Sequence, residues 1–229
     1  MSHLRRWRVL VVAASASLIA GVMLAAPAGA DPDPTITDAY DAVGTTHIGS
    51  IGADVPIAPT TLTTVLDVNT LQIVGGSLPV APQQTTFNAL GFIPIRSTVS
   101  LIETSPVTGT LTPTDNGNII TSKVSYTIKL SDVSVNVLGL WVPLFVGNNC
   151  RTIDPVTISA SSPPGQYFDV LNGGTVTGKF TIGNFRDCAP LQLPDIFGIG
   201  SLPINVLVPG TDNTVSIDIS NGRFVDPTG

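Results

Sequence analysis

The sequence is poor in the residues that long surface helices and most catalytic centres require. Beyond residue 30 it holds one glutamate, Glu103, three lysines and a single histidine, His47. Helices exposed to water need Lys, Glu, Arg and Gln, whereas Thr, Ser, Gly, Pro and Val dominate here and are typical of strands and turns. No segment after the first thirty residues shows a convincing helical period of apolar residues. These absences predict an all-β protein.

Recognisable catalytic and cofactor motifs are also absent. One histidine cannot form the multi-histidine site of a catalytic zinc, and neither H-E-x-x-H, G-x-S-x-G, a P-loop nor G-x-G-x-x-G occurs. Asp31, Asp33, Asp38 and Asp41 match no calcium-loop spacing, which favours a solvated tail over a calcium site. We therefore expect no catalytic, cofactor-binding or metal-binding residue and no enzyme. A hydrolase without a recognisable motif, using His47, is kept as a third hypothesis.

The first thirty residues are typical of an export signal. Arginines at positions 5, 6 and 8 precede the apolar run Val9 to Ala26, and the small residues Ala28 to Ala30 precede Asp31. This order predicts a signal peptide cleaved after residue 30, and hence a secreted or cell-envelope protein without a transmembrane helix. An uncleaved anchor is the alternative, because about 18 apolar residues can just span a bilayer. The adjacent arginines leave both general secretion and twin-arginine export open.

The charge of the chain limits its partners. Loss of residues 1–30 removes three arginines and no acid, so the formal charge moves from −6 to −9. Phosphate binding needs clustered Lys and Arg, so a nucleic acid is not expected as a partner. The remaining length suits one domain. We predict three segments: a signal peptide (1–30), an acidic flexible arm (31–44) and a β domain (45–229).

Short alternating segments separated by turns fill the chain from Thr45 onward. After the turn at 115–118, apolar residues at 124, 126, 128 and 130 alternate with polar ones, which indicates one buried and one exposed face. The whole pattern predicts a single antiparallel β-sandwich of about eight to ten strands with Greek-key links. Within it, Val135 to Gly147 predicts a core strand with Trp141 between two sheets, with a lipid-facing or ligand-facing patch as the alternative. Leu191 to Pro209 predicts a loop packed over an open end, with an exposed hydrophobic loop as the alternative.

Three segments share the form V-[GT]-G-[STK]-[LF]: residues 74–78, 107–111 and 176–180. A glycine in mid-strand often marks a bulge or a bend. The repetition predicts equivalent kinks in three strands, with chance in a chain rich in Val, Thr and Gly as the alternative.

Cys150 and Cys188 are the two cysteines of the chain, with 37 residues between them. This separation does not suit a C-x-x-C redox couple, and the absence of a histidine nearby does not suit a metal site. Two cysteines in a secreted chain predict a disulfide. The enclosed segment holds two strand-like runs around a Pro-Pro-Gly turn, so the bridge would join the entrance of one strand to the exit of the next. Closing a loop of about 39 residues contributes about 4 kcal/mol on the chain-entropy estimate.

Several of these segments resemble a group of secreted actinobacterial proteins that has no assigned activity. The likeness runs from "THIGSIGADVPI" through "TVLDVNTLQIVGGSLPV" and "NNCRTIDPVTI" to "GGTVTGKFTIGNFRDC". It covers roughly Thr45 to Ile219 and is most specific between Cys150 and Cys188. The residues "ADPDP" at the expected cleavage site are similar to mycobacterial and nocardial exports. The resemblance implies a mycolate-type or other Gram-positive envelope, the disulfide and an all-β fold, and it carries over no catalytic residue.

These observations favour a non-enzymatic binding or structural module for an apolar envelope lipid or a protein partner. The candidate surface comprises exceptionally apolar positions in the two Gly- and Pro-containing segments: Leu138, Leu140, Trp141, Phe145, Leu193, Ile196, Phe197 and Ile199. The alternative is an oligomeric β-barrel pore of a mycolate outer membrane, whose cation-conducting lumen the acidic residues would suit.

Overall fold

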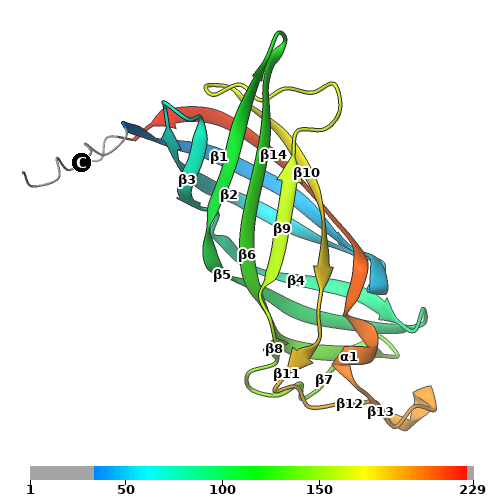
Figure 1. Ribbon diagram of the computed structural model, residues 1–229. Helices are drawn as coiled ribbons and strands as arrows, with labels where there is room; N and C mark the ends of the chain where they lie inside the picture. Colours follow the sequence, from blue (N-terminus) through cyan, green and yellow to red (C-terminus); the bar gives the residue numbers. More distant parts are fainter. Residues whose placement is uncertain (1–33, 226–229) are drawn as a thin grey trace, which may run out of the picture. The chain divides into compact units, whose positions relative to one another are not determined.

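The computed structural model describes residues 34–225 and consists almost entirely of antiparallel strands (Figure 1). The predicted all-β class is therefore confirmed. The predicted signal peptide, residues 1–30, lies outside the described residues, as do Asp31 and Asp33.

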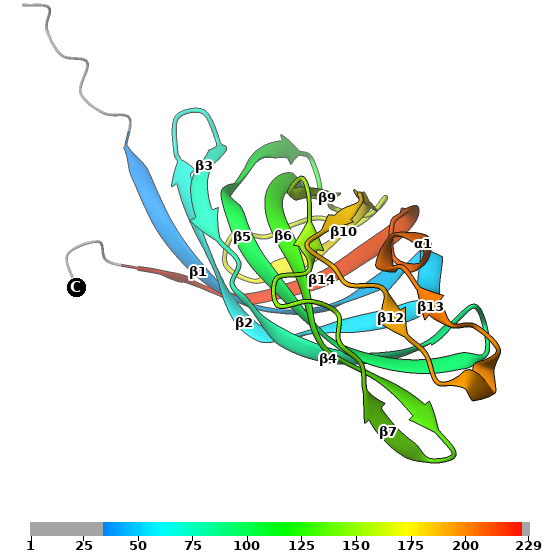
Figure 2. The same ribbon diagram turned by 90° about the horizontal axis from the view of Figure 1, so that it is seen from below.

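The main sheet closes on itself. Going round the ring, each strand pairs with the next one along the chain, β14 pairs with β1, and β5 pairs with both β3 and β6 (Figure 2). The ring strands are β1 (Thr35–Ile48), β2 (Ala53–Asp67), β3 (Gln72–Ser77), β5 (Ile93–Thr114), β6 (Gly117–Val137), β9 (Val156–Ser161), β10 (Gly173–Ile182) and β14 (Gly210–Phe224).

Further elements attach to this ring. β4 (Val80–Ala89) pairs with β5, β7 (Leu140–Pro143) pairs with β6, and β8 (Arg151–Thr152) pairs with β6 and β11 (Phe185–Arg186). β12 (Leu191–Gln192) and β13 (Ser201–Leu202) form a separate ribbon. The helical turns are η1 (Gly49–Ile51), η2 (Asp195–Phe197) and α1 (Ile204–Leu207).

The expected two-sheet sandwich with Greek-key links is not what the pairing gives. The ring is a meander, because its neighbours follow chain order, and its core is the inside of one closed sheet. Alternation predicts that one face of each strand is buried, and this holds for Val124, Tyr126, Ile128 and Leu130 in β6. Alternation does not reveal whether the buried face packs against a second sheet or against the far side of the same sheet.

The three glycines at the centre of the repeated V-x-G segments lie at equivalent close approaches of neighbouring strands. A Cβ on Gly76, Gly109 or Gly178 would collide with the carbonyl oxygen of Thr63, Thr121 or Ser159 respectively. The ladders also shift register beside the first two glycines. A strand that coils sharply needs this space, so the repetition reflects the curvature that closes the sheet.

The expected flexible arm is wrong for residues 35–44. These residues form the first part of β1, which pairs with β14 and β2, and Asp38 and Tyr40 are buried. The acidic residues suggested a solvated tail, yet Asp41 faces outward and binds Arg223 at 2.9 Å. Alternation, rather than acidity, decided the structure of this segment.

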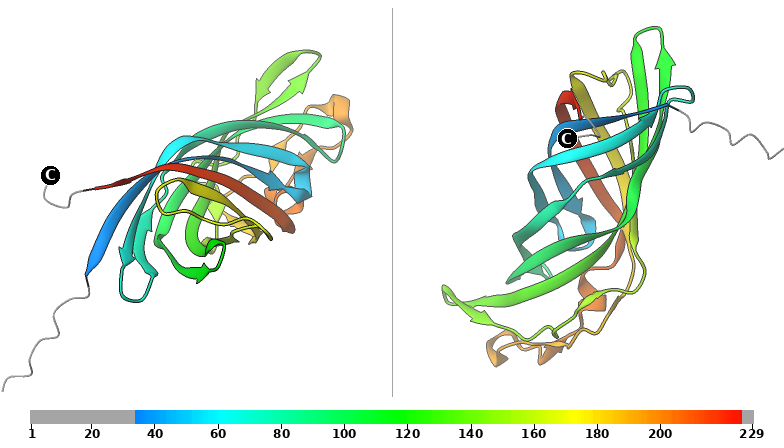
Figure 3. Two further views of the ribbon diagram at one scale, coloured as in Figure 1. Left: turned by 90° about the horizontal axis from the view of Figure 1, so that it is seen from above. Right: turned by 90° about the vertical axis from the view of Figure 1, so that its left-hand side faces the viewer.

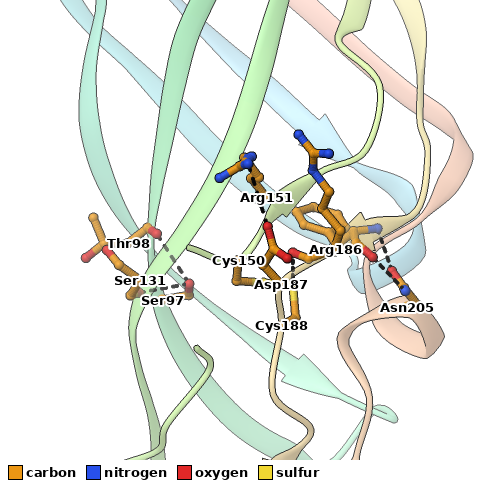
Figure 4. Close-up of a disulfide and its surroundings, with 10 residues drawn as sticks. Ser97, Thr98, Ser131, Cys150, Arg151, Arg186, Asp187, Cys188 and Asn205 are labelled. Carbon is orange, nitrogen blue, oxygen red and sulfur yellow. Dashed lines mark hydrogen bonds and ion pairs between the residues drawn. A yellow bond between two sulfur atoms is a disulfide. The ribbon is translucent and has the colours of Figure 1, made fainter. Parts of the chain in front are cut away.

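The disulfide between Cys150 and Cys188 is confirmed (Figure 4). It joins the residue before β8 to a residue just beyond β11, and these two short strands also pair with each other. The enclosed loop contains the β9–β10 hairpin, as the sequence predicted. Beside the bridge, Arg151 and Asp187 form an ion pair with a nitrogen-to-oxygen distance of 3.6 Å. A disulfide indicates an oxidising compartment outside the cytoplasm.

The two apolar segments of the sequence, residues 135–147 and 191–209, differ in how they pack. Residues 191–209 pack over one end of the sheet, as predicted, and bury Leu191, Ile204 and Val208. The expected core strand around Trp141 is wrong, because β7 pairs only with the end of β6 in a hairpin that stands out from the closed sheet (Figures 2 and 3). Trp141 is half-buried and Leu138 is 94% exposed. Hydrophobicity alone could not distinguish a core strand from a projecting apolar hairpin.

Candidate functional site

The inside of the closed sheet holds a cavity at the end covered by residues 191–209. It leaves about 70 Å³ for the centre of a water-sized sphere, several times the 10 to 15 Å³ that one water requires, on the order-of-magnitude scale for such cavities. Among the described residues that line it, none is charged, and nearly all are aliphatic or aromatic, for example Ile57, Ile128, Val156 and Phe180. Water gains little in such a lining, which therefore suits an apolar occupant.

Three hydroxyl groups of the lining, those of Thr85, Ser97 and Tyr126, are already hydrogen-bonded to the backbone. Tyr126 donates to the carbonyl oxygen of Leu78 at 2.7 Å, and Ser97 donates to that of Ser131 at 3.3 Å. Burial, followed by the nearby charge of Glu103, raises the pKa of Tyr126, so the phenol stays protonated and remains a donor. These hydrogen bonds stabilise the wall. A molecule in the interior would therefore be bound mainly through apolar contacts.

One part of the wall lacks a backbone ladder. β2 pairs with β3 from Thr63 to Asp67, but within residues 34–225 no backbone pairing joins residues 53–62 of β2 to β4, which lies beside them. Side-chain hydrogen bonds cross this boundary instead. Thr60 donates to the carbonyl oxygen of Pro79 at 2.6 Å, and Thr85 donates to that of Asp54 at 3.3 Å. We call residues 53–62 together with 80–89 the seam.

The composition of the seam explains why it has no ladder. Pro56 and Pro59 lie on its β2 side and Pro82 lies on its β4 side, and proline has no amide hydrogen to donate. The seam begins where the chain breaks between β3 and β4, at Leu78 and Pro79. Glu103, the single glutamate, holds this break, because one of its carboxylate oxygens accepts from the Leu78 amide at 3.1 Å.

The cavity reaches the surface at the seam. Of its lining residues, Pro56 on β2 and Ala81 on β4 are exposed, and the neighbouring Val80 and Gln83 are half-buried. On the opposite wall, the β6–β9 ladder extends from Thr121 to Tyr126, and a short β9–β10 ladder joins residues 159–161 to residues 177–179. The seam is thus a part of the wall where an apolar molecule would meet little backbone hydrogen bonding on its way in.

The structure divides the predicted apolar surface. Leu138, Leu140, Phe145 and Ile196 are exposed, whereas Leu193 is buried. The remaining three, which are Trp141, Phe197 and Ile199, are half-buried.

Sequence reasoning missed three exposed apolar residues at the same end of the sheet. Leu90 and Phe92 form the tip of the β4–β5 hairpin, and Val206 of α1 lines one surface depression together with Leu90. The signal that would have found the first two is a second pattern, Asn-x-Leu-Gly followed by Phe or Leu. It occurs at residues 88–92 and again at 136–140.

The polar groups considered in the sequence lie away from the cavity interior. Nδ1 of His47 lies 2.7 Å from Oδ1 of Asp54, its directly opposite partner in the β1–β2 ladder, and both side chains are exposed. Among residues 34–225, no group of three His, Cys, Asp or Glu could hold a metal ion.

Comparisons with protein-family models, with curated proteins and with solved structures find no match to this chain. In the described range, none of the helices has the length and apolar character needed to cross a membrane. The functional inference therefore rests on the geometry of the closed sheet.

Proposed function

We propose that the protein binds the aliphatic chain of a lipid in the cavity of its closed sheet. The observation that carries this proposal is a cavity whose lining, within residues 34–225, has no charged side chain and three hydroxyl groups already hydrogen-bonded to the wall. Burying a hydrocarbon chain there would gain about 0.8 kcal/mol per methylene.

The same lining disfavours a polar ligand. A polar ligand atom left without a partner inside would cost about 1 to 3 kcal/mol. The polar end of the lipid would therefore remain at the seam, beside Gln83, which is half-buried, and the exposed Ala81. Entry through the seam requires the separation of β2 from β4, which side-chain hydrogen bonds join in place of a ladder.

We further propose that the protein works in the cell envelope. The disulfide supports a compartment outside the cytoplasm, and an apolar binding cavity suits a layer rich in lipids. The alternative of a conducting pore finds less support, because a conducting lumen is polar and water-filled, whereas the interior of this sheet is apolar.

A fluorescence titration tests the proposal. Residues 31–229 contain the whole closed sheet, its core and the disulfide. This segment is freed of lipid and titrated with cis-parinaric acid, which fluoresces in apolar surroundings. We expect saturable binding of one probe per chain and displacement by a long-chain alcohol. If no saturable signal develops with the lipid-free protein, the proposal is wrong.

A pair of substitutions on β5 locates the bound probe. Val99→Phe places a larger side chain in the cavity wall, and we expect it to weaken binding at least tenfold without unfolding the protein. The control is Ile102→Phe, because Ile102 lies on the same strand and is 51% exposed. Equal affinity in the two variants would place the probe outside the cavity and contradict the proposal.

A further inference from the structure

Two hairpin tips combine the same sequence pattern with the same unusual backbone. In Asn88–Phe92 the φ angle is +53° at Leu90 and +82° at Gly91, and in Asn136–Leu140 it is +51° at Leu138 and +90° at Gly139. Turns with two successive residues at positive φ normally use Asn-Gly, because a bulky side chain is disfavoured there. The turn itself therefore does not explain the choice of leucine.

Burial does not explain these leucines either. Leu138 is 94% exposed and Leu140 is 73% exposed, and in the other tip Phe92 is 59% and Leu90 is 49% exposed. Isolated exposed apolar residues are common on protein surfaces, but four on two strained turns form a group that needs an explanation.

The two tips project from the same end of the sheet. Ile95, near the start of β5, pairs with Val135, near the end of β6, so the turns that precede β5 and follow β6 lie at the same end of the sheet. Figures 1 and 2 show both hairpins at the end that carries the 191–209 segment. Val206 and Ile196 of that segment, 66% and 63% exposed, extend the apolar group. We call Leu90, Phe92, Leu138 and Leu140 the apolar tips.

Immediately behind the apolar tips lies an arginine–tryptophan pair. The guanidinium carbon of Arg96 is 4.5 Å from the ring centroid of Trp141, and Nε of Arg96 is buried without a hydrogen-bond partner. Both residues have apolar bodies and polar ends, which suits the boundary between lipid chains and headgroups.

The charge around the tips fits the same boundary. The segments 80–96 and 133–151 contain no Asp or Glu, although the chain has 16 acidic residues. Their charged side chains are Arg96 and Arg151. Of the acids at this end, Asp132 is exposed directly before the second segment, Asp187 pairs with Arg151, and Asp195 precedes Ile196 on η2. The hairpins can therefore approach headgroup phosphates without a carboxylate in front.

We propose that the apolar tips insert into the surface of a lipid layer, with Arg96 and Trp141 at the level of the headgroups. Narrow tips that carry separate side chains suit a deformable layer better than the flat contact of a second protein copy. This inference concerns the outer end of the sheet and does not depend on what the cavity binds.

Trp141 provides a direct test, because Trp7 is the other tryptophan of the chain and residues 31–229 exclude it. The apolar run at 9–26, which would itself bind lipid, is excluded too. We expect phosphatidylcholine vesicles to shift Trp141 emission to the blue, acyl-chain-brominated lipid to quench it, and the protein to float with the vesicles. Unchanged emission and no flotation would overturn the proposal.

Leu90→Asn with Leu138→Asn is the decisive variant, because asparagine fits positive φ better than leucine and the fold should survive. We expect its vesicle partitioning to fall about 100-fold, as for the loss of two buried leucines. Leu171→Asn is the matched control, since Leu171 is 57% exposed and lies near Phe168, which bridges to Asn118 at the other end of β6.

The remaining outcomes each decide the question. Val99→Phe should partition like the unaltered protein, which separates this proposal from a failure of the cavity proposal. Undiminished partitioning of the double asparagine variant would overturn the proposal. So would self-association that Leu138→Asn abolishes while vesicles leave Trp141 emission unchanged, because a second copy would then be the partner.

Discussion

Asn213 shows how a single polar side chain can fix several segments of a closed sheet. It is fully buried, and Nδ2 donates to the carbonyl oxygens of Phe180 at 3.2 Å and Gly210 at 2.8 Å. Its Oδ1 accepts from the amide of Gly49 at 3.1 Å. One side chain thus links β10, the start of β14 and η1, close to the covered end of the cavity.

Substitution of Asn213 by Ala should destabilise the fold markedly. The change leaves the Gly49 amide and two carbonyl oxygens without their partner, and we expect the free energy of unfolding to fall by at least about 2 kcal/mol. Urea unfolding measures it. Asn116→Ala removes an exposed amide that donates to Tyr167 at 3.3 Å and should change stability by less than about 0.5 kcal/mol. Similar losses in the two variants would contradict the role assigned to Asn213.

Two aspartates on β1 respond to opposite surroundings. Asp38 is buried, and burial raises its pKa above the ordinary value of 3.8. Asp41 is on the outer face, where hydrogen bonds from Asn221 and then Arg223 lower its pKa. Alternation along a strand therefore places one carboxyl inside the sheet and another outside.

The raised pKa of Asp38 predicts a pH-dependent loss of stability. From pH 3.8 up to the raised value, the native protein holds a proton that the unfolded chain has released, so stability decreases as pH rises. Asp38→Asn has no such titration. We expect it to gain stability relative to the unaltered protein across this window and to keep that gain at neutral pH. Urea unfolding at a series of pH values would show a constant difference if Asp38 were not responsible.

At the scale of elements, glycine positions decide how sharply the strands coil. Gly76, Gly109 and Gly178 each face a carbonyl oxygen of the adjacent strand at a separation that a Cβ could not occupy. The second element-level device is the break between β3 and β4. It is held by Glu103 and Tyr126, and it moves the chain from a ladder with β2 to the seam.

Gly178→Ala tests the first of these devices. Its new methyl group would meet the carbonyl oxygen of Ser159, so β9 and β10 must separate, and we expect a loss of about 1 to 3 kcal/mol. Gly183→Ala is the control, because a Cβ at Gly183 would meet nothing within 4 Å and its φ is not positive. Thermal unfolding compares the two. A stable Gly178→Ala variant would show that the close approach is not needed.

For the whole molecule, closure depends on the contact between β5 and β6 and on the covalent bridge. The β5–β6 ladder extends from the turn at Thr114 and Gly117 to Ile95 and Val135. The disulfide joins the two ends of the segment that carries β9 and β10.

Replacement of both Cys150 and Cys188 by Ala should lower the free energy of unfolding by about 4 kcal/mol, mainly because the unfolded chain gains freedom. Cys150 is fully buried, so part of any loss comes from packing. The described residues contain no free cysteine, so the native protein should not react with a thiol reagent until it is reduced. Labelling before reduction, or an unchanged urea midpoint in the double variant, would contradict this role.

Local pattern was sufficient for some parts of this protein and insufficient for others. Val124, Tyr126, Ile128 and Leu130 were placed on the buried face correctly, because alternation is a property of the strand itself. The cavity and the seam could not be predicted, because they depend on which strands become neighbours. Hydrophobicity predicts both a core strand for residues 135–147 and an apolar surface that includes Leu138, because it does not specify what a segment packs against. Leu138 is exposed.

The sequence by itself determined the all-β class, the faces of the strands, the glycine kinks and the disulfide, since each depends on residues near in the chain or on a pairing with no competitor. Only the tertiary structure decided that one sheet closes as a meander, that a proline-rich seam borders an apolar cavity, and that two leucine tips project from the same end. These features arise from contacts between distant segments, where many arrangements satisfy the same local pattern and the total buried apolar area selects one.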